Sequence, residues 1–156
     1  MDKMHQVAVT FGRFNLLHVG HLELFRRMSQ QANKVVIGIS SAPANLPLKA
    51  RVEVITKGLY DDDMDVEIVA GHQPFEVFAS QPKDTKLFLG TDQIQLAHAA
   101  ERAFGWQTEL VRRLTSSTTV RQYIDNEDWD LLANIVPGSI IRDVINLHMF
   151  KGLRNA

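Results

Sequence analysis

The sequence contains no cysteine among its 156 residues. This absence excludes disulfide bonds, thiolate metal sites and a cysteine nucleophile, and it fits a reducing compartment such as the cytoplasm. The chain also lacks an excess of either charge: 17 basic residues face 18 acidic ones, and the formal net charge is -1. We therefore expect that the protein binds neither nucleic acid nor a membrane surface. Any phosphate group would then be bound by a few residues at one site.

Long apolar segments are missing as well. No segment approaches the roughly 20 apolar residues that cross a bilayer, and residues 1–6 carry no apolar stretch of the kind found in signal peptides. We therefore expect a cytoplasmic protein. Hydrophobic residues make up 45% of the chain, enough for a sizeable core, and the length fits one compact domain over residues 1–156.

Short apolar runs typical of strands alternate with amphipathic stretches typical of helices. The expected strands cover residues 7–11, 35–39, 66–69, 86–90 and 109–111. The expected helices cover residues 19–32, 52–59 and 93–104, followed by helices from 117 onward that are broken by Pro137 and Gly138. This alternation predicts an α/β fold, with a doubly wound, mostly parallel sheet and a helical C-terminal tail.

Ligands of such sheets bind beyond the carboxyl ends of the strands. The first loop at that edge contains His18, Gly20 and His21 at the start of an expected helix. Two imidazoles three residues apart can share one helix face and donate hydrogen bonds to phosphoryl oxygens. We interpret Gly20 as leaving room for phosphate at the helix N-terminus. The alternative is two surface histidines on an ordinary helix, which the position after the first strand disfavours.

A second segment, residues 115–121, reads Thr-Ser-Ser-Thr-Thr-Val-Arg and also opens an expected helix. Its hydroxyls can cap the helix and offer hydrogen bonds to phosphate. The guanidinium of Arg121 can bind phosphate oxygens through two parallel hydrogen bonds. Taken alone, the segment would be an N-cap cluster with a solvated arginine, but together with the histidine pair it predicts a nucleotide-phosphate site.

These two motifs resemble those of the nucleotidylyltransferase superfamily, which is marked by His-x-Gly-His and by a later Ile-Ser-Ser-Thr-x-Ile-Arg segment. The chain is most similar to the archaeal-type nicotinamide mononucleotide (NMN) adenylyltransferases, whose first loop reads Gly-Arg-Phe-x-Pro-x-His-x-Gly-His. The similarity covers nearly the whole chain and includes Arg51 and the pair Asp128 and Trp129. It implies a Rossmann-like nucleotidylyltransferase fold.

Three positions depart from the archaeal-type pattern. Leu16 replaces a proline, Thr115 replaces an isoleucine, and residues 90–92 read Gly-Thr-Asp where Ser-Gly-Asn is usual. The last departure affects the identity of the acceptor more than the type of reaction. The alternatives are therefore another phosphate acceptor (phosphopantetheine, flavin mononucleotide, or an alcohol phosphate with CTP) and an ATP-binding sensor without turnover.

The resemblance implies an enzyme that converts ATP and NMN to NAD and pyrophosphate, with His18 and His21 stabilising the transition state. The residues that it implies for binding ATP and its phosphates are Phe11, Gly12, Arg13, Phe14, Gly20, Ser116, Ser117, Thr118 and Arg121. It places Gly90 and Asp92 near the adenosine.

Three further contacts to phosphate or acceptor are expected from Lys49 and Arg51, on the loop after the second strand, and from Phe75, in a short loop over residues 71–80. A solvated loop lysine is the alternative for Lys49, and packing in the core is the alternative for Phe75. We expect Mg²⁺ to be carried by the ATP phosphates and not by a protein metal site, since the run Asp61–Asp63 is typical of a solvated connection. The resemblance also implies a homo-oligomer.

Overall fold

Two compact units make up the computed structural model, which describes residues 4–150. The sheet unit contains residues up to 13, then 24–42 and 63–113. The helical unit contains residues 14–23, 43–62 and those from 114 onward. Neither unit is one continuous stretch of chain, and each is described by itself.

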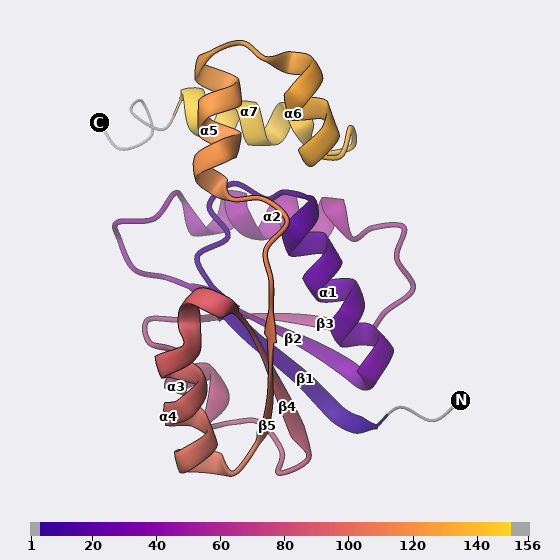
Figure 1. Cartoon of the computed structure of the whole chain (residues 1–156), viewed down its shortest axis with the longest axis vertical. Helices are drawn as coiled ribbons and strands as arrows, with labels where there is room; N and C mark the ends of the chain where they lie inside the picture. Colours follow the sequence, from indigo (N-terminus) through magenta and orange to yellow (C-terminus); the bar gives the residue numbers. More distant parts are fainter. Residues whose placement is uncertain (1–3, 151–156) are drawn as a thin grey trace. The chain divides into compact units, whose positions relative to one another are not determined.

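The sheet unit contains five parallel strands in the order β3-β2-β1-β4-β5 (Figure 1). The strands are β1 (His5–Gly12), β2 (Ala32–Ser40), β3 (Val66–Gly71), β4 (Thr85–Gly90) and β5 (Gln107–Val111). The helices of this unit are α3 (Pro74–Phe78), the short 3-10 helix η1 (Thr91–Gln93) and α4 (Ile94–Phe104), joined by the second half of α1 (Val19–Gln31).

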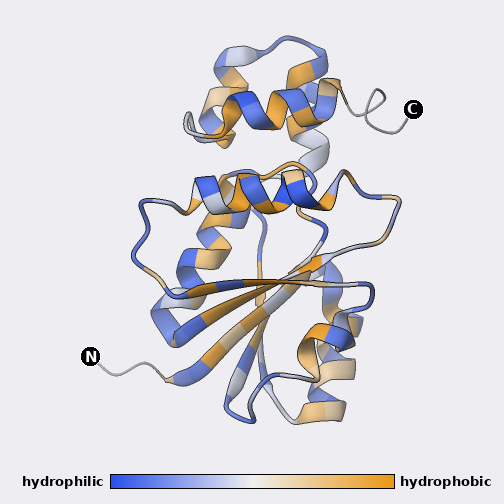
Figure 2. Cartoon of the chain, turned by 180° about the vertical axis from the view of Figure 1, so that it is seen from behind, coloured by the Kyte–Doolittle hydropathy of each residue, from blue (hydrophilic) through white to orange (hydrophobic). Residues whose placement is uncertain are grey.

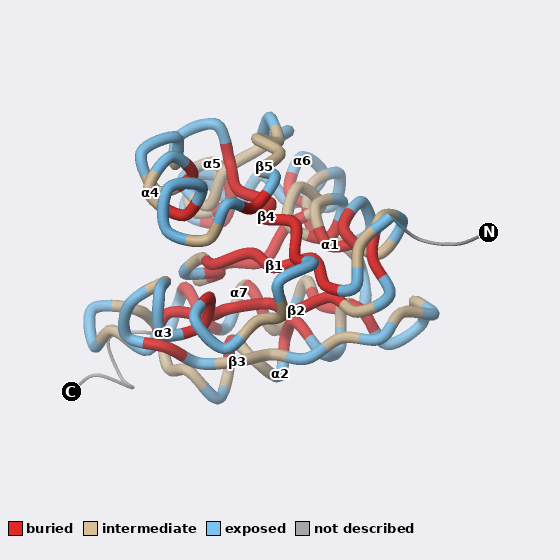
Figure 3. Tube along the Cα trace, turned by 90° about the horizontal axis from the view of Figure 1, so that it is seen from below, coloured by how far each residue is buried: buried red, intermediate tan, exposed pale blue. Residues whose placement is uncertain are grey.

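The central strands are apolar on both faces, as expected of a covered parallel sheet. Figure 2 shows hydrophobic residues concentrated along the strands, and Figure 3 shows β1, β2 and β4 largely buried. On one face, side chains of these three strands pack with residues of α3 and α4 and with Trp106. The edge strands β3 and β5 are only partly buried.

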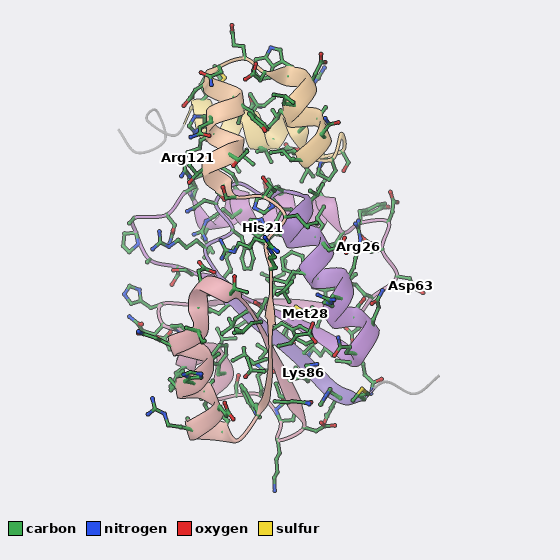
Figure 4. The ribbon with its side chains drawn as sticks, in the orientation of Figure 1. His21, Arg26, Met28, Asp63, Lys86 and Arg121 are labelled. Carbon is green, nitrogen blue, oxygen red and sulfur yellow. The ribbon has the colours of Figure 1, made fainter. Side chains whose placement is uncertain are left out.

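The opposite face of β4 carries a buried lysine. Lys86, which is labelled in Figure 4, donates hydrogen bonds to Gln31 Oε1 at 2.6 Å and to Glu109 Oε1 at 3.0 Å. Burial alone would raise the pKa of Glu109, but hydrogen bonds from Lys86 and Gln31 and the charges of Lys86 and Arg27 outweigh it, and the pKa of this carboxyl lies below its ordinary value. The network therefore ties β5 to β4 and to the end of α1.

The helical unit consists of helices with buried apolar faces. They are the first turn of α1, α2 (Leu48–Gly58), α5 (Ser117–Asp125), α6 (Trp129–Ile135) and α7 (Ile141–Met149). A Cβ on Gly58 of α2 would lie 3.3 Å from side-chain atoms of both Leu17 and Leu22, so these elements pack closely. Polar pairs join the helices: Lys57 donates to Asp143 at 2.9 Å, and His148 lies 2.7 Å from Asp125.

The sequence-based expectation of the fold is confirmed, including the parallel sheet and the helical C-terminal segment. One expectation is wrong: residues 71–80 are not a simple loop, because Pro74–Phe78 forms α3. Pro74 at the first helical position favours this short helix. Among residues 4–150, no helix is both long and apolar enough to cross a membrane.

Gly38 of β2 offers a test of the packing. A Cβ on Gly38 would lie 2.8 Å from Phe11 Cδ2 and 2.9 Å from the carbonyl oxygen of Thr10, which is backbone and cannot swing away. We expect Gly38→Ala to lower the free energy of unfolding by about 1–3 kcal/mol, the cost of overpacking a core. Urea denaturation measures this. Gly138→Ala is the control, since nothing lies within 4 Å of its Cβ position. Equal stability of the two variants would contradict this packing.

Candidate active site

The two histidines form a reciprocal cap at the start of α1. His18 directly precedes the helix, and its carbonyl oxygen accepts hydrogen bonds from the N–H groups of His21 and Leu22. Its Nδ1 accepts the N–H of Gly20 at 3.0 Å, while Nδ1 of His21 accepts the N–H of His18 at 3.3 Å. The arrangement resembles a capping box, with imidazoles in place of the usual hydroxyl and carboxylate, except that the side chain of His18 binds the second helical N–H and not the third.

The cap determines which nitrogen of each neutral imidazole carries hydrogen. An Nδ1 atom that accepts a backbone N–H carries no hydrogen itself, so the hydrogen is on Nε2. The neutral rings therefore carry their hydrogen on Nε2, an atom that is buried in His18. The rings are stacked, with centroids 3.8 Å apart and an interplanar angle of 20°. The two imidazoles therefore share one face at the start of α1, as the spacing predicts.

Phe14 supports this pair from within the histidine loop, defined here as residues 14–18. Its ring makes an edge contact with His21, with centroids 5.1 Å apart, and its side chain is buried. Phe14 has a φ of 49°, in the left-handed region that non-glycine residues rarely occupy. The chain therefore turns sharply at Phe14.

The small size of Gly20 is required by the packing of its neighbour. A Cβ at this position would lie 2.9 Å from Cε1 and 3.0 Å from Nδ1 of His18. Glycine therefore leaves room for the ring of His18, and its expected place beside phosphate stays a prediction.

The hydroxyl segment, residues 115–121, caps α5 as expected. Ser116 is the N-cap residue, and its Oγ accepts the N–H of Thr119 at 3.1 Å. Arg121 lies in the second turn and donates through Nη2 to Thr118 Oγ1 at 2.9 Å. His21 and Arg121, both in the helical unit, are labelled in Figure 4.

The helical unit brings the two motifs together. Ser117 Oγ donates to the carbonyl oxygen of Leu16 in the histidine loop at 3.4 Å. The Cβ position of Gly20 lies 3.9 Å from the backbone nitrogen of Leu114, just before the hydroxyl segment. The start of α1 and the start of α5 are thus neighbours, although about 100 residues separate them in the sequence.

Other predicted residues belong to the sheet unit. Gly12 ends β1 and Gly90 ends β4, and these parallel neighbours end at the same edge of the sheet. Arg13 follows Gly12 and is exposed. Asp92 is exposed and pairs with Arg113 at 3.4 Å.

The sheet unit also contains Phe11 and Phe75. Phe11 is buried in the core. Phe75, expected in a loop, lies on α3 instead, where its ring contacts Phe104 at 5.5 Å and Phe78 at 5.9 Å between centroids. It is 39% exposed. Its observed partners are therefore aromatic side chains of its own unit.

Lys49 and Arg51 are not on a loop. Both lie in the first turn of α2, because the helix begins directly after Pro47, earlier than the apolar spacing indicates. Lys49 is exposed, but Arg51 is 2% exposed and its Nε donates to the carbonyl oxygen of Leu46 at 2.7 Å. Burial lowers the pKa of this guanidinium from its ordinary value.

The reasoning from sequence missed one polar residue in this region, Asn15. Its side chain binds Asn45 and the backbone of Leu46. Nothing in the sequence joins positions 30 residues apart, so only the fold could reveal this contact. Within residues 4–150, no group of three or more His, Cys, Asp or Glu side chains is arranged to hold a metal ion.

A parallel α/β sheet, a histidine-capped helix and a neighbouring hydroxyl-capped helix are the features of a nucleotide-handling α/β enzyme. The cytidylyltransferase-like family model matches residues 9–129, most of the chain and both motifs. The chain therefore belongs to the cytidylyltransferase-like family, within the nucleotidylyltransferase superfamily, and is a nucleotidyltransferase.

Individual relatives agree with this membership. A nicotinamide-nucleotide adenylyltransferase of Methanoculleus marisnigri is 26% identical over 169 aligned positions, which cover 92% of each chain. Among solved structures, a Plasmodium falciparum nicotinic acid mononucleotide adenylyltransferase complexed with APC has a TM-score of 0.70 at 11% identity, covering 94% of this chain and 97% of that one. Thermotoga maritima TmcAL bound with alpha-thio ATP has a TM-score of 0.55 at 14% identity, covering 96% and 56%. The two structures share the fold.

Substitution of Gly20 separates the histidine geometry from helix stability. We expect Gly20→Ala to displace the ring of His18, because the added Cβ would lie 2.9 Å from it. Nucleotidyl transfer should fall by roughly 100-fold, the scale of a misplacement of about 1 Å. Stability should fall by no more than about 1 kcal/mol, the cost of losing the cap on the Gly20 N–H, because the higher helix propensity of alanine offsets part of that loss. Turnover and urea denaturation measure the two effects, and a variant with unchanged turnover would show that the ring position does not matter.

Proposed function

We propose that this nucleotidyltransferase transfers the adenylyl group of ATP to NMN and produces NAD and pyrophosphate. The observation that carries the proposal is the stacked histidine pair at the start of α1, whose Nδ1 atoms accept backbone N–H groups, next to the hydroxyl-capped start of α5 in the same unit. The M. marisnigri relative, which bears the name of this activity, supports the choice of NMN.

In the proposed reaction, an oxygen of the NMN phosphate attacks the α-phosphorus of ATP. One P–O bond forms there, the bond to the oxygen bridging to the β-phosphorus breaks, and pyrophosphate leaves with that electron pair. No general base is needed, because a phosphate monoester is already largely anionic at neutral pH. The protein contributes alignment and stabilisation of charge.

We assign the stabilisation of charge to His18 and His21. As phosphoryl oxygens gain charge in the transition state, two Nε2–H donors fixed beforehand stabilise them without reorganisation. The burial of His18, 1% exposed, strengthens this effect, because hydrogen bonds are stronger where water is excluded.

The hydroxyl segment is assigned to the phosphates of ATP. The side chains of Ser116, Ser117 and Thr118 lie at the N-terminal end of a nine-residue helix, where N–H groups and partial positive charge favour anions. Arg121, one turn further on, would hold the departing pyrophosphate with its planar guanidinium. Arg13, Gly12, Gly90 and Asp92 remain assigned to ATP by resemblance.

Mg²⁺ is proposed as part of the substrate, bound to the ATP phosphates. Mg²⁺ retains most of its waters and prefers phosphate oxygens, so it needs few protein ligands. The homo-oligomer, the cytoplasmic location and a single domain over residues 1–156 stay predictions.

One assay tests the acceptor. Purified protein is incubated with Mg²⁺, ATP and one acceptor at a time: NMN, nicotinate mononucleotide, phosphopantetheine or flavin mononucleotide. We expect pyrophosphate and NAD with NMN. Turnover with another acceptor, and with neither pyridine nucleotide, would refute NMN as the substrate but would leave the assignment of nucleotidyl transfer intact. Binding of ATP without pyrophosphate from any acceptor would identify a sensor.

Asparagine variants test the role of the histidines without removing the cap. In His18→Asn or His21→Asn, the amide oxygen can replace Nδ1 as acceptor of the backbone N–H, but no group reaches the position of Nε2. We expect turnover to fall by about 100- to 1,000-fold for each variant, the scale for one lost transition-state donor. Unfolding free energy should change by less than about 0.5 kcal/mol, in contrast to His18→Ala, which loses a cap worth about 1 kcal/mol. Near-normal turnover of both asparagine variants would refute this mechanism.

Arg121→Lys tests the guanidinium. A lysine keeps the charge but cannot form two parallel hydrogen bonds to phosphate, so we expect turnover to stay impaired by roughly 10-fold or more. Arg142→Lys is the matched control, because Arg142 lies on α7 and has no assigned role. A fully active Arg121→Lys variant would show that this arginine is a surface residue without a specific role in binding phosphate.

A further inference from the structure

One residue before α2, Leu46, has both its backbone N–H and its backbone carbonyl bound by side chains. The N–H of Leu46 donates to Oδ1 of Asn15 at 3.0 Å, and the carbonyl oxygen of the same residue accepts Nε of Arg51 at 2.7 Å. The side-chain amide of Asn15 also donates to Oδ1 of Asn45 at 3.1 Å. We name this set of contacts the Asn15–Leu46–Arg51 clamp.

The position of Asn15 in the chain gives the clamp its importance. Asn15 lies between Phe14, whose ring contacts His21, and Leu16, whose carbonyl oxygen accepts Ser117 Oγ. Three consecutive residues of the histidine loop therefore contact three different segments of the helical unit. The clamp is the contact to the segment over residues 43–47.

That segment depends on such contacts for its position. It has no regular secondary structure, and the N-cap residue of α2, Pro47, makes no side-chain hydrogen bond to the helix. Proline also lacks an N–H with which to anchor the chain. The hydrogen bonds of Asn15 and Arg51 to Leu46 therefore fix the chain just before the first turn of α2.

We propose that Asn15 is a positioning residue, which couples the segment before α2 to the histidine loop and so fixes the first turn of α2 relative to His18 and His21. This inference rests on the proposed function, since it assigns to Asn15 a part in aligning that site. Asn15 acts through Leu46 and does not need to touch substrate.

The carboxamide suits this role because it combines an acceptor and a donor on a short side chain. Aspartate can keep the bond from the Leu46 N–H, and the amide of Asn45 can rotate to donate to the second carboxylate oxygen. Alanine can do neither. Comparing Asn15→Asp with Asn15→Ala therefore shows whether the hydrogen bonds of this side chain hold Leu46 in place.

Amide hydrogen exchange at Leu46, followed by NMR, tests the clamp without any assay of activity. We expect exchange to accelerate by about 10-fold or more in Asn15→Ala, because local opening governs exchange. Asn15→Asp should retain most of the protection. Asn45→Ala should have a smaller effect than Asn15→Ala, and Asn33→Ala, at an exposed position of β2, should have none. Wild-type exchange in Asn15→Ala would overturn the clamp.

Kinetics then test the coupling. We expect Asn15→Ala to lower kcat by roughly 10- to 100-fold, as expected when reacting groups are misplaced by about 1 Å, while KM for ATP changes less. A thermal melt confirms that the variant is folded. An unchanged kcat with accelerated Leu46 exchange would overturn the positioning role. Absence of turnover in the wild type with every acceptor would refute the proposed function instead, and the exchange experiment would still decide on the clamp.

Discussion

The reciprocal cap at the start of α1 is the interaction on which the candidate site depends. Two backbone N–H groups, of His18 and Gly20, donate to the two Nδ1 atoms and so fix the orientation of both rings. The start of the helix and the orientation of the histidine pair are thus established together. The His-x-Gly-His spacing follows directly: the histidines occupy the N-cap and third helical positions, and the glycine between them leaves room for the first ring.

Much of the fold followed from the sequence because its signals are local. Buried parallel strands read as continuous apolar runs, and Ser116 lies where a helix cap is expected. The pairing of the two histidines was also predictable, since three residues on a helix determine it. Such features depend on residues that are neighbours in the sequence, so one strand or one turn of helix is enough to predict them.

The errors and omissions concern contacts between distant segments. Phe75 was expected in a loop, where its ring could face a ligand, but it lies on α3 and its ring packs on Phe104, nearly 30 residues further on. Arg51 was expected on a loop, but Pro47 starts α2 early and the guanidinium is buried against Leu46. Asn15 drew no prediction because its partners are in another segment. Side-chain pairing between segments depends on the packed fold, which periodicity does not describe.

Leu16 shows how the histidine loop retains its shape without the proline found in the archaeal-type enzymes that the chain resembles. Loss of that proline leaves the unfolded chain more freedom, at a cost of roughly 0.4–1 kcal/mol. Leu16 is 1% exposed, and full burial of a leucine side chain contributes about 1.5–3 kcal/mol. Its carbonyl oxygen also accepts Ser117 Oγ. The buried side chain of Leu16 therefore offsets the lost covalent restraint, while the hydrogen bond from Ser117 ties the loop to the second motif.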